Sequence, residues 1–93
     1  MNNIKVIFYN VETVDSNAFE SALKSNNNYI SHIVLKPGFY FVNFHGSAKD
    51  LFDALGAVIQ EKSIIIHDLD SDNNAFWGYW NRNVWDWLRN NRS

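Results

Sequence analysis

The feature that most constrains the fold of this 93-residue chain is the order in which strand-like and helix-like segments alternate. Runs of β-branched and aromatic residues predict strands, and apolar residues that recur every three or four positions predict helices. Strands are expected at Ile4–Val11, Tyr29–Leu35, Phe39–Phe44 and Ser63–Leu69. A first helix is expected to follow Asp15, with apolar positions at Ala18, Phe19, Ala22 and Leu23, and to end in the polar run Asn26-Asn27-Asn28. A second helix is expected at Ala48–Ile59 and a short last one at Val84–Asn90. The order is strand, helix, strand, strand, helix, strand, followed by a tail.

Local residues mark the ends of these segments. Asp15 is expected to cap the first helix, and Ser47 with Asp50 is expected to form a capping box at the start of the second. Asn83 is expected to cap the last helix. Lys36-Pro37-Gly38 predicts a type II turn that joins two strands into a hairpin, because proline presets the first central position and glycine accepts positive φ at the second.

This order is typical of an α+β, ferredoxin-like fold, in which two helices cover one face of an antiparallel sheet. Right-handed crossovers place the first and third strands side by side in its centre. In the first strand Ile4, Val6 and Phe8 face one way while Ile7 and Tyr9 face the other, so both faces are apolar. The face without helices must be hidden by the tail, by a second subunit or by both. A homodimer is expected, because symmetric self-association commonly covers such a face.

The C-terminal tail, from about residue 75 to 93, carries all four tryptophans of the chain. A large aromatic ring hides roughly 150–250 Å² when it is buried, so the tail must dock onto some surface. Docking onto its own core, at about residues 4–69, is favoured, and an interface for a second subunit or a ligand is the alternative. The residues expected at an interface are Tyr9, Val42, Trp77, Trp80, Trp85 and Trp87.

Composition limits the class of function. Residues 1–93 form one domain, because the chain is too short for a second core. The absence of cysteine and of a signal-peptide pattern predicts a cytoplasmic protein. No apolar run approaches the ~18 residues that predict a membrane span. A net charge of −2 disfavours nucleic acid as a ligand and favours a protein partner.

Few residues suggest catalysis or metal binding. His32, His45 and His67 lie on or beside different strands, and no two have the i,i+4 spacing of a zinc site. His45 is expected to be exposed and His67 half buried, and histidines could serve as acid and base in metal-free RNA cleavage. The segment Asp68–Asn74 begins like a calcium loop but lacks the glycine at its sixth position, and the loop would also lack its final glutamate. We expect no metal and no cofactor.

Several short motifs carry a resemblance to a known family. They are an apolar first strand ending Ile7-Phe8-Tyr9-Asn10-Val11, an aromatic hairpin strand Phe39–Val42, and a small-residue turn Ser47-Ala48. The tail adds Trp77-Gly78-Tyr79 and Trp87-Leu88. In these features the chain resembles, from end to end, the small ferredoxin-like proteins related to CRISPR-associated protein 2, particularly the SinR-like branch.

The resemblance implies a homodimer. In nuclease members an aspartate that closes the first strand binds a divalent metal, and the matching residue here is Asn10. A neutral amide holds a hard cation more weakly than a carboxylate does. The expected function is therefore a homodimeric binding or assembly module without metal nuclease activity, in a bacterial or phage conflict system. The alternative is a small endoribonuclease or toxin–antitoxin component acting on RNA, with Asn10, His45 and His67 as its candidate catalytic residues.

Overall fold

The structure, a computed structural model, describes residues 4–69 and 82–91. Its strands are β1 (Ile4–Tyr9), β2 (Tyr29–Lys36), β3 (Phe39–Phe44) and β4 (Ile64–Asp68). Its helices are α1 (Ser16–Lys24), α2 (Ala48–Leu55) and α3 (Arg82–Asn91), and a short 3₁₀ helix, η1 (Gly56–Ile59), follows α2. The predicted α+β class is confirmed within these residues.

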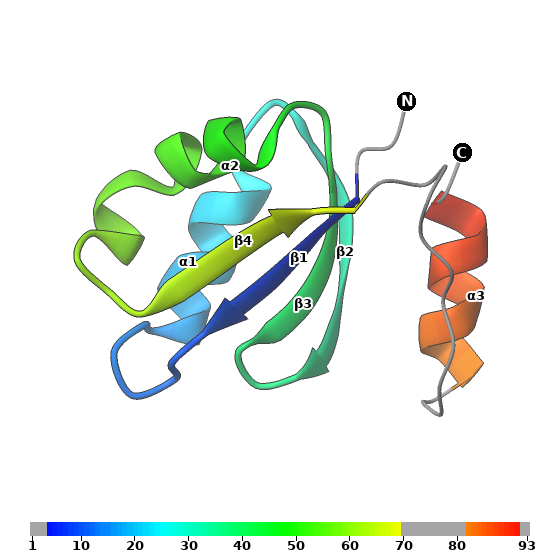
Figure 1. The fold of residues 1–93 in the computed structure, drawn as a ribbon, viewed down its shortest axis with the longest axis horizontal. Helices are drawn as coiled ribbons and strands as arrows, with labels where there is room; N and C mark the ends of the chain where they lie inside the picture. The colour runs from blue at the N-terminus through cyan, green and yellow to red at the C-terminus, as the bar shows by residue number, and fades with distance from the viewer. Residues whose placement is uncertain (1–3, 70–81, 92–93) are drawn as a thin grey trace.

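The four strands form one antiparallel sheet in the order β2-β3-β1-β4, so β1 and β3 occupy the centre as predicted. Figure 1 shows α1 and α2 on one side of this sheet and α3 on the other. We call the two sides the helix face, which packs against α1 and α2, and the second face, which packs against α3. None of the helices in residues 4–69 and 82–91 has the length and apolar character that a membrane crossing requires.

The predicted capping and turn residues act as expected at three places. The Asp15 side chain accepts a hydrogen bond from the Asn17 amide, and Ser47 and Asp50 form the capping box of α2. The Ser47 backbone amide donates to the Asp50 carboxylate at 3.0 Å, and hydrogen bonding by the Ser47 backbone and side chain lowers the pKa of the Asp50 carboxyl. Gly38 has φ +83°, which fits the predicted type II turn.

Other predicted boundaries need correction. The second helix was expected to reach Ile59, but α2 ends at Leu55, because Gly56 leaves the helical conformation at φ +58° and η1 follows. Asn83 does not cap the last helix, since α3 already begins at Arg82 and contains it. The strands β1 and β4 are also shorter than expected, ending at Tyr9 and Asp68.

The main core lies between the helix face and the helices α1, α2 and η1. Phe19 and Leu23 of α1 and Leu51 and Leu55 of α2 are buried there, because apolar residues at helical spacing line one side of each helix. The sheet contributes the alternate residues of its two central strands, and the cluster is completed by the loop residue Val14 and by η1. The buried residues outside α1 and α2 are Ile7, Tyr9, Val14, Tyr40, Val42, Phe44 and Ile59.

A second, smaller core lies between the second face and α3. Val84 and Leu88, four residues apart on α3, are buried against Ile4 of β1. Partly buried apolar side chains surround this centre. They are Ile33, Leu35, Phe41, Leu69, Trp85 and Trp87. The sheet is therefore covered on both faces, but α3 covers only part of the second one.

Candidate functional site

The docking of α3 accounts for part of the aromatic tail. Trp85 and Trp87 pack against the second core, and the Trp87 ring stacks on Phe41 with 6.4 Å between ring centroids. The prediction that the tail docks onto its own core is confirmed for these two residues. Trp77 and Trp80 lie outside the described residues.

Polar side chains hold the end of α3 on the sheet. The Asn91 Oδ1 atom accepts hydrogen bonds from Ser31 Oγ at 2.8 Å and from Asn43 Nδ2 at 3.0 Å, and Asn91 Nδ2 donates to the Trp87 carbonyl at 2.8 Å. Asn43 is buried beneath the helix. These contacts fix the position of α3, because a displaced helix would leave the buried Asn43 side-chain amide without this acceptor.

An apolar row crosses three strands on the second face. Phe8 of β1 lies opposite Phe39 of β3 and opposite Ile65 of β4. Phe8 and Phe39 stack with their centroids 4.1 Å apart and their planes at 9°. The exposed fractions are 48% for Phe8 and 69% for Ile65. We call these three residues the open patch, in which Phe8 and Ile65 are exposed and Phe39 is partly buried. Exposed apolar side chains that lie opposite each other on neighbouring strands are typical of an interaction site.

Two of the predicted interface residues do not lie at this patch. Tyr9 and Val42 were expected at an interface, but both are buried in the main core against α1 and α2. The alternation along each strand shows which residues share a face, but not which face the helices cover. This prediction is wrong, and the residues that take the exposed position are those on the opposite face, Phe8 and Ile65.

Asn10 follows β1 and lines a surface hollow of about 430 Å³ beside the open patch. Phe8, Lys62, Ser63 and Ile65 are among the other residues of its wall. The Asn10 Oδ1 atom accepts a hydrogen bond from the backbone amide of Glu12 at 2.9 Å. The backbone amide of Asn10 donates a hydrogen bond to the Ser63 carbonyl at 2.9 Å. The side-chain oxygen therefore caps the turn after β1, which is an ordinary structural role for asparagine.

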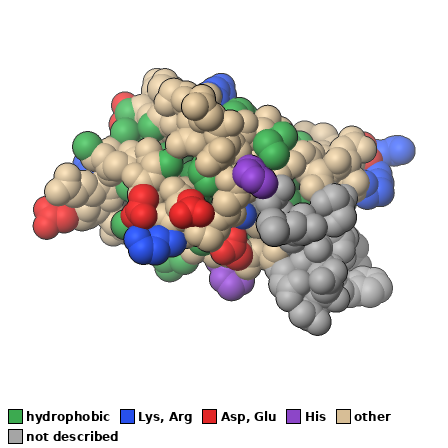
Figure 2. All heavy atoms as spheres, turned by 90° about the horizontal axis from the view of Figure 1, so that it is seen from above, with side chains coloured by type: hydrophobic (Ala, Val, Ile, Leu, Met, Phe, Trp, Pro, Cys, Tyr) green, Lys and Arg blue, Asp and Glu red, His purple; other side chains and the backbone are tan. Residues whose placement is uncertain are grey.

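The structure does not bring Asn10, His45 and His67 together. Asn10 follows the C-terminal end of β1, whereas His45 follows the C-terminal end of β3. His67 belongs to β4 and lies opposite Val6 of β1. Because β3 and β4 both run antiparallel to β1, the two histidines lie toward the other end of the sheet. Both are exposed, although His67 was expected to be half buried, and histidine, acidic and basic side chains are interspersed on the surface seen in Figure 2.

A buried lysine lies near that end of the sheet. Lys5 is 1% exposed, and its Nζ atom lies 3.0 Å from Asp68 Oδ1 and 3.3 Å from the Phe44 carbonyl oxygen. The other carboxylate oxygen of Asp68 accepts the Ala48 amide, the first residue of α2, at 3.0 Å. Asp68 thus joins β1, β4 and the start of α2. A buried ammonium needs such partners, because its desolvation is costly.

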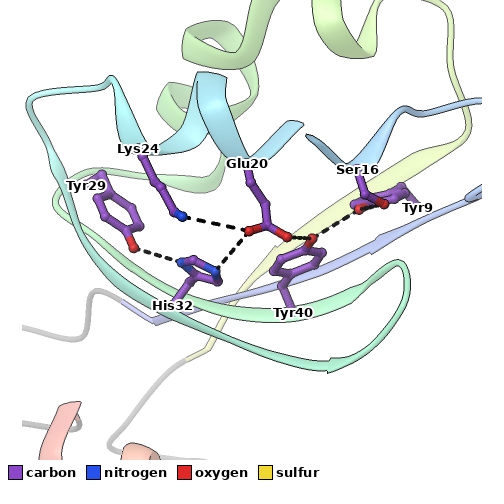
Figure 3. A network of polar contacts seen from close by, with 7 residues as sticks. All are labelled: Tyr9, Ser16, Glu20, Lys24, Tyr29, His32 and Tyr40. Atoms are coloured by element: carbon purple, nitrogen blue, oxygen red, sulfur yellow. Dashed lines mark hydrogen bonds and ion pairs between the residues drawn. The ribbon is translucent and has the colours of Figure 1, made fainter. Parts of the chain in front are cut away.

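A polar network joins α1 to the sheet on the helix face (Figure 3). Tyr40 donates to Glu20 Oε2 at 2.6 Å, and the Tyr9 hydroxyl lies 3.1 Å from that of Tyr40. On the other side of Glu20, His32 Nε2 lies 3.7 Å from Oε1, and the Tyr29 hydroxyl lies 2.7 Å from His32 Nδ1. The members come from α1 and from three strands, so the network holds the helix in register with the sheet.

Burial sets the protonation states in this network. Burial raises the pKa of the Tyr40 phenol, and the hydrogen bonds to Glu20 and Tyr9 raise it further. Burial lowers the pKa of His32, although Glu20 opposes this effect and Lys24 adds to it. The Tyr40 phenol therefore stays a neutral donor to Glu20 near pH 7. The network is a structural clamp, and sequence analysis missed Glu20 and Tyr40, whose only signal is that a buried tyrosine hydroxyl needs a partner.

The lowered pKa of His32 predicts a loss of stability on mild acidification. The unfolded chain takes up a proton near pH 6.5, whereas the folded chain resists it, so stability is fully present above that pH and is lost as the pH falls through the folded pKa. Urea midpoints measured between pH 7.5 and 5.5 should decrease. His32→Gln should flatten this dependence, whereas His45→Gln, at an exposed position, should preserve it. An equal slope in wild type and His32→Gln would contradict the assignment.

Comparisons with protein-family models, with curated proteins and with solved structures find no match to this chain. Within residues 4–69 and 82–91, no three histidine, aspartate or glutamate side chains lie close enough together to hold a metal ion. We therefore define the candidate functional site from the structure alone, as the open patch with the hollow beside it.

Proposed function

We propose that this chain is a homodimeric, ferredoxin-like binding and assembly module of the kind related to CRISPR-associated protein 2, without metal nuclease activity. A role in a bacterial or phage conflict system follows from that relationship. The observation that carries the proposal is the open patch, because the exposed side chains of Phe8 and Ile65 lie opposite each other on neighbouring strands and suit a covering protein surface. The strand order β2-β3-β1-β4 with two helices on one face supports the fold assignment.

A protein surface suits the patch better than nucleic acid does. Exposed aromatic rings on a sheet can stack bases, but such sites are accompanied by basic side chains that follow the phosphates. Here the net charge is −2, and the residues of the open patch are apolar. A second copy of the chain brings the same apolar surface, so pairing removes both from water at once.

Metal-dependent cleavage is not expected of this module. The Asn10 Oδ1 atom accepts a hydrogen bond from the Glu12 backbone amide, and Lys62 lines the same hollow, so the position offers a cation no negative charge and only a neutral amide oxygen. The purified protein with Mg²⁺ or Mn²⁺ should leave RNA and DNA intact, as followed on denaturing gels. Cleavage that EDTA abolishes and Asn10→Ala removes would contradict this expectation. EDTA-resistant cleavage that is lost in His45→Ala or His67→Ala would instead support an endoribonuclease.

The dimer can be tested with two isoleucines at opposite edges of the sheet. Ile65 on β4 is 69% exposed and belongs to the open patch, whereas Ile30 on β2 is 54% exposed at the far edge. Wild type should sediment at about twice the chain mass at micromolar concentration. Ile65→Lys should convert it to a monomer, because two ammonium groups would have to be buried at the contact. Ile30→Lys, the matched control, should remain dimeric. A monomeric wild type would refute the proposed dimer.

A further inference from the structure

The two edge strands of the sheet differ in how well they could accept another strand. The pairing of β2 with β3 shifts register between Tyr29 and Ser31 and again between Val34 and Lys36, and Pro37 follows β2. Bulges and prolines protect an edge against further pairing. The pairing of β4 with β1 has no register shift, and β4 contains no proline. Within the described residues, β4 is the unprotected edge.

The backbone of β4 has hydrogen-bonding groups directed away from β1. The Ser63 carbonyl accepts the Asn10 amide, and the Leu69 amide donates to the Ile4 carbonyl, so the odd-numbered residues direct their backbone groups toward β1. These directions alternate along a strand. The amide and carbonyl groups of Ile64 and Ile66 therefore face outward, where no strand of residues 4–69 or 82–91 pairs with them.

Two hollows with apolar residues in their walls border this edge. On the side of α2, a hollow of about 370 Å³ is lined by Ala48, Lys49, Phe52 and Ile66. At the Asn10 end of the edge, the hollow of about 430 Å³ beside the open patch includes Ile65 of the second face and Ile64 of the helix face in its wall. A strand added to β4 would direct alternate side chains to these two faces. Hollows beside an open edge are the features that strand addition uses.

We propose that β4 pairs antiparallel with β4 of a second copy, about a two-fold axis that passes beside Ile65. This inference rests on the proposed homodimer and names the contact that forms it. In this register Ile64 lies opposite the partner's Ile66, and both have outward backbone groups, so they exchange two hydrogen bonds. The two-fold axis generates a second, equivalent pair, in which Ile66 lies opposite the partner's Ile64. The result is one continuous sheet of eight strands, four from each copy.

Opposite charges on and just before the two β4 strands favour this register over the registers shifted by two residues. Lys62, just before β4, lies opposite the partner's Asp68, and the side chain of Asp68 is 50% exposed despite its contact with Lys5. Moving the partner by two residues keeps the outward groups paired but places an isoleucine opposite Lys62 or opposite Asp68. Opposite charges on facing strands favour the matched arrangement and contribute mainly to specificity. The same register brings the Ile65 side chains of both copies together, so the two open patches become one surface.

Amide hydrogen exchange followed by NMR tests the pairing, with sedimentation measured on the same samples. In the dimer the Ile64 and Ile66 amides should be protected, and their protection should fall on dilution to the monomer. The amides of Ile65 and His67, which face β1, should stay protected at both concentrations. A dimer in which the Ile64 and Ile66 amides exchange rapidly would overturn edge pairing but leave the proposed dimer intact. Protection that dilution does not change would place another segment on this edge and would also overturn it.

A single introduced cysteine provides a second test, because the chain has no cysteine of its own. At the two-fold axis the Ile65 residues form a pair without mutual hydrogen bonds, with Cα atoms about 4.5 Å apart, which suits a disulfide. Ile65→Cys should give a disulfide-linked dimer under mild oxidation, seen on a non-reducing gel. Ile30→Cys, on the opposite edge, should stay unlinked. Equal linkage of the two variants, or none for Ile65→Cys, would contradict the proposed axis.

Discussion

Asp68→Ala should lower the free energy of unfolding by about 3 kcal/mol, because it leaves the Lys5 ammonium buried without its carboxylate. The same change removes the acceptor for the Ala48 amide at the start of α2. The value lies at the lower end for a broken ion pair, since Asp68 is half exposed and water can partly replace it. Urea denaturation followed by circular dichroism measures the loss.

The variant Lys5→Met distinguishes the contribution of the ion pair to stability from that of the packing of the Lys5 side chain. Methionine has nearly the length of the lysine stem and carries no charge, so we expect a change of less than about 1 kcal/mol. The double variant Lys5→Met/Asp68→Ala should recover much of the stability lost in Asp68→Ala, since the unpaired charge is then gone. Additive effects of the two substitutions would show that Asp68 acts only through α2.

Leu88→Ala should cost about 2–4 kcal/mol and loosen α3 from the second face. Leu88 is buried with Val84 and Ile4 at the centre of the smaller core, where a truncated side chain leaves a cavity. All four tryptophans of the chain lie in the tail, so intrinsic tryptophan fluorescence reports on that segment. The emission should shift to the red in Leu88→Ala before the main core unfolds.

Two controls define this result. Asn90→Ala changes an exposed residue of the same helix and should leave the emission and the unfolding midpoint close to wild type. Phe19→Ala truncates the main core and should unfold the whole domain, without an early change confined to the tail. Fluorescence and circular dichroism curves that coincide in Leu88→Ala would show that α3 and the sheet unfold as one unit, and would refute a separately loosened helix.

Much of the α+β architecture was predictable because it depends on local signals. Asp15 and Ser47 cap helices through hydrogen bonds to neighbours within three residues, and Gly38 adopts the conformation its turn needs. The predicted end of the second helix was wrong because a glycine outweighed the apolar periodicity. The apolar periodicity continued to Ile59, but Gly56 ended α2 and left the last turn as η1.

The candidate site was predictable only in outline. That the second face of β1 and β3 is apolar and needs a cover follows from the sequence, and α3 with Trp85 and Trp87 supplies part of that cover. The three residues of the open patch come from strands far apart in the chain, and only the registers of β1 with β3 and β4 place them in one row. The same is true of the network around Glu20.

The sequence by itself determined the order of elements, their capping residues and the presence of two apolar faces, since periodicity and capping depend on residues close together in the chain. The tertiary structure decided which face the helices cover, and so buried Tyr9 and Val42 and exposed Phe8 and Ile65. It also decided that Lys5 meets Asp68 and that β4 lies at an open edge. Side chains alternate between the two faces of a sheet with a period of two, and this pattern does not show which face the helices cover. Only packing between segments far apart in the chain distinguishes the two faces.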